Sequence, residues 1–230
     1  MPHPITSVRQ PPYTLDFGRD AGKKVPELAS LALNIIGAAS MADADFLRLV
    51  APFTHGRSAP VIEFFLSLRN EGPKVAVIEA LAAASLSKER FDLFKAVAKQ
   101  YSTAVKHRQP IAHWLWGHCI EIPDALLLLN PKDWLEERAL ADPIYVKAYR
   151  AYQNGDADAL KSCATELYEL SASRFDCVQV YRKKDFQTAE KILWQASKSL
   201  KDFHIILGWD LSDRAQGDEL AKKLAAELET

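Results

Sequence analysis

A chain of 230 residues and 25.7 kDa is long enough for one large domain or two small ones, and 48% hydrophobic with 26% charged residues is typical of an ordinary folded protein. Lys and Arg total 29 and Asp and Glu total 30, so the formal net charge is -1, which argues against a protein that coats nucleic acid through bulk charge but leaves room for a local basic patch. No apolar run approaches the roughly 20 residues that cross a bilayer, and the N-terminus lacks the apolar core of a signal peptide. Three widely spaced cysteines, Cys119, Cys163 and Cys177, indicate reduced thiols. We therefore expect a cytoplasmic protein without membrane contact.

Residues 1–24 are rich in residues that interrupt helices. Pro2, Pro4, Pro11, Pro12 and Gly18 follow one another closely in this stretch. Proline removes a backbone donor and is excluded from helix interiors, so the segment is predicted to be an extended N-terminal arm.

Helical periodicity dominates from residue 25 to the end of the chain, and residues 25–230 are predicted to be a single domain. Pro26 suits a first helical turn, Asp43, Ser58, Ser87 and Asp185 are candidate caps, and Pro110 is expected to break a long helix at Gln109. The fold class is therefore mainly α, a bundle of roughly eight or nine helices. The predicted helices span residues 26–36, 43–50, 58–68, 73–86, 87–107, 143–153, 160–170, 185–203 and 220–228.

Residues 111–130 do not follow the helical pattern. Trp114, Trp116 and Ile120 fall on an alternating, strand-like pattern, whereas the apolar run 126–129 suits either a buried strand or a helical turn. Residues 175–181 alternate in the same way. These segments could pair as a minor two-stranded β ribbon, which needs helices packed over it to be stable.

One segment contains side chains of the kind that catalyse reactions. Arg108 and His113 are five positions apart, next to the expected helix break. A guanidinium can fork onto two phosphate oxygens, and an imidazole titrates near neutrality and can move a proton. Metal-free cleavage of an RNA phosphodiester needs these two roles, with the 2′-hydroxyl of the RNA itself as nucleophile.

The stretch Lys106-His107-Arg108-Gln109-Pro110-Ile111-Ala112-His113 resembles the R-N-x-I-A-H core of the HEPN superfamily. Arg108 and His113 fall on the two functional positions of that motif and Gln109 on its polar position, where the family commonly has Asn; Trp114 replaces a frequent Gly. The resemblance implies an all-helical fold with a long helix before the motif, which residues 90–107 supply. It also implies a homodimer whose two motifs face each other across a cleft.

From these residues we expect a metal-independent endoribonuclease acting on single-stranded RNA, with no cofactor and no bound metal. Arg108 would hold the scissile phosphate and His113 would act as general acid or base, while Gln109 and His118 would orient the phosphate or the histidine. A toxin–antitoxin role would add an antitoxin-like protein partner. The candidate RNA contacts are Lys106, His107 and Trp114.

Other interpretations of the same residues stay open. Arg108 could interact with the last carbonyls of the preceding helix, and His113 could be partly buried and hydrogen-bonded beside tryptophan, in a non-catalytic module for dimerisation or for binding a nucleotide or partner. The spacing of His107, His113, His118 and Cys119 does not match that of a structural zinc site. Paired tryptophans such as Trp114 and Trp116 more often anchor a core or an interface than stack on bases.

Overall fold

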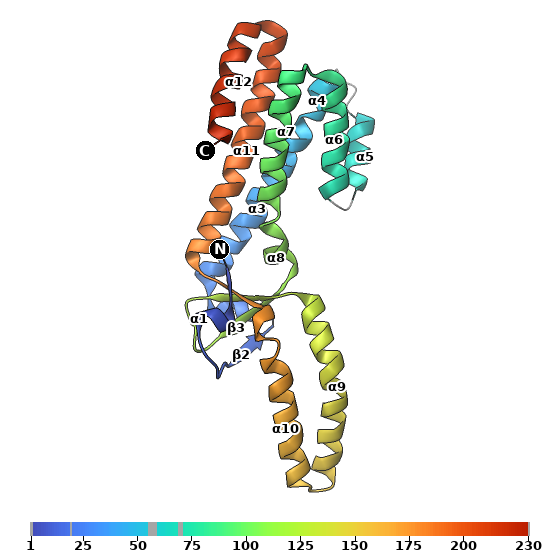
Figure 1. The fold of residues 1–230 in the computed structure, drawn as a ribbon, viewed down its shortest axis with the longest axis vertical. Coiled ribbons are helices and arrows are strands. Elements are labelled where there is room, and N and C mark those ends of the chain that lie inside the picture. Colours follow the sequence, from blue (N-terminus) through green and yellow to red (C-terminus); the bar gives the residue numbers. More distant parts are fainter. Residues whose placement is uncertain (1, 19, 55–58, 69–70, 230) are drawn as a thin grey trace. The chain divides into compact units, whose positions relative to one another are not determined.

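The computed structural model describes residues 2–18, 20–54, 59–68 and 71–229 (Figure 1). The chain is mainly helical, which confirms the predicted fold class. The helices are α1 Ile5–Val8, α2 Ala21–Lys24, α3 Pro26–Arg48, α4 Val50–Phe53, α5 Ala59–Ser67, α6 Glu71–Ser85, α7 Lys88–Val105, α8 Arg108–His113, α9 Pro131–Gln153, α10 Ala157–Ala172, α11 Lys183–Ser212 and α12 Arg214–Leu228, with a 3-10 turn at Phe175–Cys177. The strands are β1 His3–Pro4, β2 Leu15–Phe17, β3 Leu115–Cys119, β4 Leu126–Leu129 and β5 Val178–Tyr181.

The chain divides into two compact units, a division that the sequence did not indicate. Unit 1 comprises Met1–Leu33 and Gln109–Gln187, and unit 2 comprises Asn34–Arg108 and Thr188–Thr230. Three helices, α3, α8 and α11, contribute residues to both. Continuous helical periodicity hid this division, because no Gly- or Ser-rich linker marks the boundary.

Unit 1 is built on a five-stranded antiparallel sheet in the order β1-β5-β4-β3-β2. The predicted two-stranded ribbon is therefore corrected: the ambiguous segment 111–130 supplies the β3–β4 pair, and β5 joins the other side of β4. The two edge strands, β1 and β2, come from residues 1–24, the segment predicted to be an extended N-terminal arm. Proline is tolerated at sheet edges, which reconciles this N-terminal composition with a place in the sheet.

The sheet is covered on both faces. All four residues of β4 are buried, as expected for an apolar run in the middle of a sheet. On one face, Leu127 and Val180 pack with Ile5 of α1 and Phe175. On the other, α2 packs on β3, where Trp116 lies against Gly22. The buried side chain of Ile5 and the pairing of β1 with β5 hold the N-terminal residues against the sheet.

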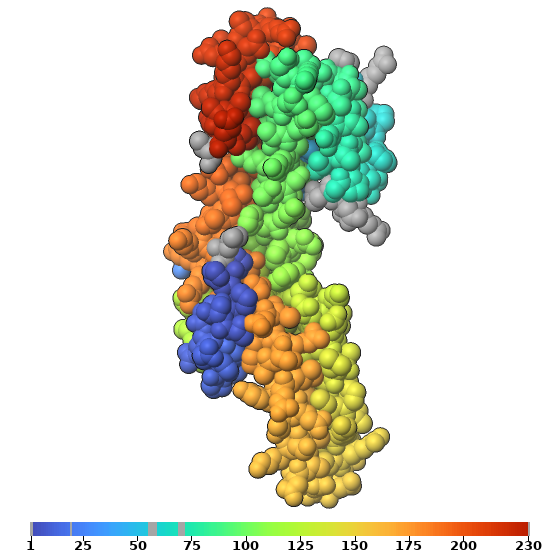
Figure 2. Space-filling model, in the orientation of Figure 1, coloured from blue at the N-terminus to red at the C-terminus, as the bar shows by residue number. Residues whose placement is uncertain are grey.

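A long helical hairpin, α9 and α10, leaves the sheet after β4 and returns to β5. The two helices lie side by side (Figure 1), and their side chains are in direct contact (Figure 2). Asn130 caps α9 and Asp156 caps α10, while Gly155 adopts a φ of 68° in the turn between them. The helix predicted to begin at residue 143 begins at 131 instead, because the cap at Asn130 starts it earlier and Pro143 is accommodated inside the helix.

Unit 2 is a helical bundle around a cluster of aromatic rings. The rings of Phe46 and Tyr101 stack with centroids 4.3 Å apart, and Phe94 contacts Phe46, Phe53 and Phe203 with centroid distances of 6.5, 5.8 and 5.8 Å. Such pairs add to the stabilisation that burial of their large apolar area already gives. They join α3, α4, α7 and α11.

Several predicted helix ends differ from the structure. Ser87 caps α7 as predicted, accepting from the Arg90 backbone N–H. Asp43 does not start a helix, since α3 runs through it. Asp185 is not the cap of α11 but reaches back to the Arg182 backbone N–H from the first turn, as in half of a capping box. The cap expected at Ser58 lies outside the described residues.

One stretch of the described residues, Pro26–Phe53, is long and apolar enough to span a membrane by length and composition. Buried residues such as Ile35, Ala39 and Phe46 line this stretch, and the core helix of a soluble protein has the same composition. The finding is weak support for a membrane span.

Candidate functional site

The residues of the Arg/His motif form a short helix of their own. The preceding helix α7 ends at Val105, and α8 begins at Arg108 and ends at His113. The expected break therefore falls two residues before Gln109, and Pro110 occupies the first turn of α8, where a missing N–H costs nothing. The boundary between the two units falls after Arg108, so Arg108 is described with unit 2 and His113 with unit 1.

Arg108 is held by a carboxylate of unit 2. Its Nη1 lies 3.6 Å from Oδ2 of Asp43 on α3, and the Arg108 side chain is 32% exposed. Oδ1 of Asp43 accepts a hydrogen bond of 2.8 Å from the Tyr101 hydroxyl on α7. Arg108 Nε is buried and has no hydrogen-bond partner among the described residues. Arg108 thus pairs with a side chain rather than with the carbonyls that end α7, and part of its donor capacity is unused.

His113 is exposed at the C-terminal end of α8. The backbone N–H of the next residue, Trp114, donates a hydrogen bond of 2.9 Å to the carbonyl of Pro110, and the helix ends there. The non-catalytic interpretation expects His113 to be at least partly buried and hydrogen-bonded, and the exposed side chain differs from that expectation. An exposed imidazole at this position is accessible to a substrate.

The side chains around the motif differ in accessibility. Lys106 and Gln109 are exposed, whereas His107 is half-buried, and desolvation lowers the pKa of its imidazole. Trp114 is half-buried too, so its exposure lies between that of a ring that stacks on bases and that of a ring that anchors a core. Nε1 of Trp116, in β3, donates a hydrogen bond of 2.9 Å to the carbonyl of Ile111, which connects α8 to the sheet.

His118 is half-buried in β3, in register with Asp16 of β2. Its neighbour Cys119 is buried, and desolvation raises the pKa of the thiol. The thiol donates a hydrogen bond of 3.1 Å to Oε2 of Glu121. Across the ranges that the structure describes, no three His, Cys, Asp or Glu side chains are grouped to hold a metal ion. Cys119, Cys163 and Cys177 are free thiols, and the first two are buried.

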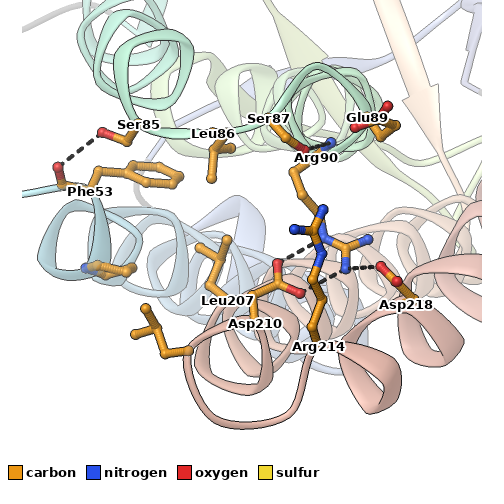
Figure 3. Close-up of a pocket in the computed structure, with 12 residues that line it drawn as sticks. Phe53, Ser85, Leu86, Ser87, Glu89, Arg90, Leu207, Asp210, Arg214 and Asp218 are labelled. Atoms are coloured by element: carbon orange, nitrogen blue, oxygen red, sulfur yellow. Dashed lines mark hydrogen bonds and ion pairs between the residues drawn. The ribbon is translucent and has the colours of Figure 1, made fainter.

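A hollow of about 470 Å³ in unit 2 was not suggested by any sequence motif. Arg90 of α7 donates from Nε and Nη2 to Asp210 of α11, at 2.8 and 2.7 Å, and from Nη2 to Asp218 of α12, at 2.6 Å (Figure 3). The hydrogen bond to Asp210 raises the pKa of Arg90. Arg90 and these two carboxylates therefore join α7, α11 and α12.

Sequence reasoning missed Asp43 and Tyr101. The available signal was an acidic side chain inside the otherwise apolar stretch 26–53, since a carboxylate on the core side of a helix needs a partner. Asp45 shows the same pattern: its side chain is 1% exposed and binds Ser197 and Lys201 of α11.

No protein-family model, no curated protein and no solved structure matches this chain.

Proposed function

We propose that the chain is a metal-independent endoribonuclease that cuts single-stranded RNA with Arg108 and His113. The observation that supports this most directly is that the two ends of α8 carry a partly exposed guanidinium and an exposed imidazole. Both retain groups that can act on a bound phosphate.

In the proposed reaction the 2′-oxygen of a ribose attacks the adjacent phosphorus, its proton is taken up, and the bond to the 5′-oxygen of the next nucleotide breaks. The products are a 2′,3′-cyclic phosphate and a 5′-hydroxyl, and the 5′-oxygen receives a proton. Arg108 stabilises the charge on the phosphoryl oxygens, and His113 transfers a proton as general base or acid. DNA has no 2′-hydroxyl and is not a substrate.

The surrounding residues have supporting roles in this proposal. Gln109 and His118 orient the phosphate or His113, and Asp43 orients Arg108 as a positioning residue. Lys106, His107 and Trp114 contact the RNA strand. The protein acts in the cytoplasm as a homodimer, without a cofactor, and an antitoxin-like protein is its proposed partner.

A second candidate function is a non-catalytic module for dimerisation or for binding a nucleotide or partner. The ion pair between Arg108 and Asp43 favours it, because a neutralised guanidinium attracts a phosphate less strongly. The net charge of -1 also favours it.

The experiment is cleavage of end-labelled single-stranded RNA in EDTA. We expect wild-type protein to cut the RNA but not the DNA of the same sequence, and His113→Ala to lower the rate at least about 100-fold, the usual contribution of a general acid or base. His204→Ala, a change of an exposed histidine on α11, is the matched control and should cut at the wild-type rate. Equal cleavage by the wild type and His113→Ala would remove the assignment, and no cleavage by the wild type would favour the non-catalytic module.

A further inference from the structure

Unit 1 contains a second hollow, of about 410 Å³, between the sheet and the base of the α9–α10 hairpin. Its volume falls in the range of sites that bind small molecules. β2, β4 and β5 supply apolar side chains, and aromatic rings line much of the rest. Among the residues that form its wall are Tyr13, Phe17, Leu129, Trp134, Tyr168 and Phe175.

The aromatic rings in this hollow are partly open to solvent. Trp134 is 38% exposed and Tyr168 is 55% exposed. The rings of Tyr13 and Phe175 meet edge to face with centroids 4.7 Å apart, which fixes the opposite wall. Partly exposed rings over a rigid apolar wall suit a flat aromatic ligand, because such a ligand would cover the ring faces that are now exposed to solvent.

Two arginines reach the hollow, and their surroundings differ. Arg174 is paired, since its Nη1 lies 3.3 Å from Oε2 of Glu136. Arg138 lies over the rings of Trp134 and Tyr145, with its guanidinium carbon 5.9 and 5.6 Å from the ring centroids. In the part of the chain that the structure describes, no carboxylate lies within ion-pair distance of Arg138. Stacking occupies the face of a guanidinium and leaves its in-plane N–H groups free to donate.

We propose that this hollow binds a small aromatic carboxylate, with one or two fused rings against the aromatic side chains and the carboxylate on Arg138. The fork of a guanidinium matches the two oxygens of a carboxylate. This site is independent of the proposed cleavage of RNA and does not require it.

The neighbouring acidic side chains favour a monoanion over a dianion such as a phosphate monoester. Glu137 lines the hollow, and its Oε1 accepts a hydrogen bond of 3.0 Å from the Ser171 hydroxyl. Glu136, the preceding residue, forms the ion pair with Arg174. Each repels a second negative charge on the ligand. Oε2 of Glu137 can also accept a hydrogen bond from a ring N–H, which selects a ligand such as an indole acid.

Isothermal titration calorimetry of the full chain tests the proposal with indole-3-acetate, 2-naphthoate and benzoate as probes. We expect one site per chain for at least one of them. The Arg138→Gln variant keeps a polar but shorter side chain and loses the charge and the fork of N–H groups, and should bind about tenfold more weakly, as the loss of one charge-assisted pair implies. Arg150→Gln, which changes another exposed arginine of α9 outside the hollow, is the matched control and should bind like wild type.

Two further ligands test the chemistry of the site. Indole-3-acetamide, which keeps the ring and loses the charge, should bind more weakly than the acid, and adenosine monophosphate should bind more weakly than any acid that binds. Circular dichroism of each variant shows that it is folded. The proposal is overturned if none of the three acids binds at concentrations up to about 10 mM, if Arg138→Gln binds the acid as tightly as wild type, or if the nucleotide is the preferred ligand.

Discussion

The carboxylate of Asp43 lies 3.6 Å from the guanidinium of Arg108, and the same carboxylate accepts a hydrogen bond from Tyr101. The Asp43 and Arg108 side chains are 24% and 32% exposed, so solvent screens the ion pair and limits what it adds to stability. The pair holds the Arg108 guanidinium beside α3, while the buried Arg108 Nε has no hydrogen-bond partner among the described residues.

We predict that Asp43→Asn slows RNA cleavage about tenfold, equivalent to about 1.4 kcal/mol of barrier, because Arg108 loses the charge that orients it. The amide oxygen can still accept from Tyr101, so thermal stability should change little. The measurement is the rate at saturating RNA together with a melting curve. An unchanged rate would show that Asp43 does not position Arg108 for the reaction.

The sequence predicted this region only in part. The helix before the motif and its Ser87 cap could be predicted, because local side-chain to backbone bonding decides them. Asp43 resembled a helix cap for the same local reason, but its carboxylate is bound by Tyr101, a residue 58 positions away. Tertiary partners of this kind leave no local pattern.

The ion pairs of Arg90 should matter for the stability of unit 2. Its side chain is only 12% exposed, and Arg90→Ala leaves Asp210, 23% exposed, without its partner. We predict that the free energy of unfolding falls by about 2 kcal/mol, less than for a fully buried pair because solvent reaches both aspartates. Urea denaturation measures this. Lys95→Ala breaks the exposed pair with Asp92 on the same helix and should change stability by no more than about 0.5 kcal/mol.

Gly117 of β3 has no room for a side chain. A Cβ there would lie 2.5 Å from two ring atoms of Phe17, the residue opposite it on β2. We predict that Gly117→Ala destabilises the protein by about 1–3 kcal/mol, since the ring must move out of a packed position. Gly37→Ala is the matched comparison, because no other side chain among the described residues lies within 4 Å of a Cβ at that exposed helical position. It should stabilise the protein by about 0.5–1 kcal/mol. Equal melting temperatures for the two variants would contradict the packing described at Gly117.

Glu121 links stability to pH. Hydrogen bonds of 2.8 Å from the Thr14 backbone N–H, and others from the Cys119 thiol and the Thr14 hydroxyl, lower the pKa of Glu121 from 4.5 to about 2. A lowered pKa means that the ionised form stabilises the fold, so this contribution is complete above about pH 4.5 and is lost as the pH falls towards about 2. The Glu121→Gln variant should therefore be less stable than wild type at about pH 7, with a smaller difference at about pH 3. Denaturation at both values measures it, and a difference that grows in acid would contradict the hydrogen bonds to Glu121.

The sheet was the harder half of the fold to predict. Four residues of β4 are buried on both faces and carry no alternation, so periodicity could not separate a strand from a helical turn. Strands of two and three residues at the N-terminus, β1 and β2, are too short to leave a pattern, and pairing with β5 and β3 is what makes them strands. The hollow that contains Arg138 depends on that pairing too, and no sequence motif marks it.

A double-mutant cycle shows whether Arg108 and His113 act on the same phosphodiester. Arg108→Lys keeps the charge and loses the fork, and His113→Ala removes the proton carrier. If the two groups act as a unit, the double variant should cleave labelled RNA in EDTA about as slowly as the slower single variant. Single-turnover rates of the four proteins give the answer. Rate losses that simply multiply, or four equal rates, would show that the two side chains do not act together on the phosphodiester.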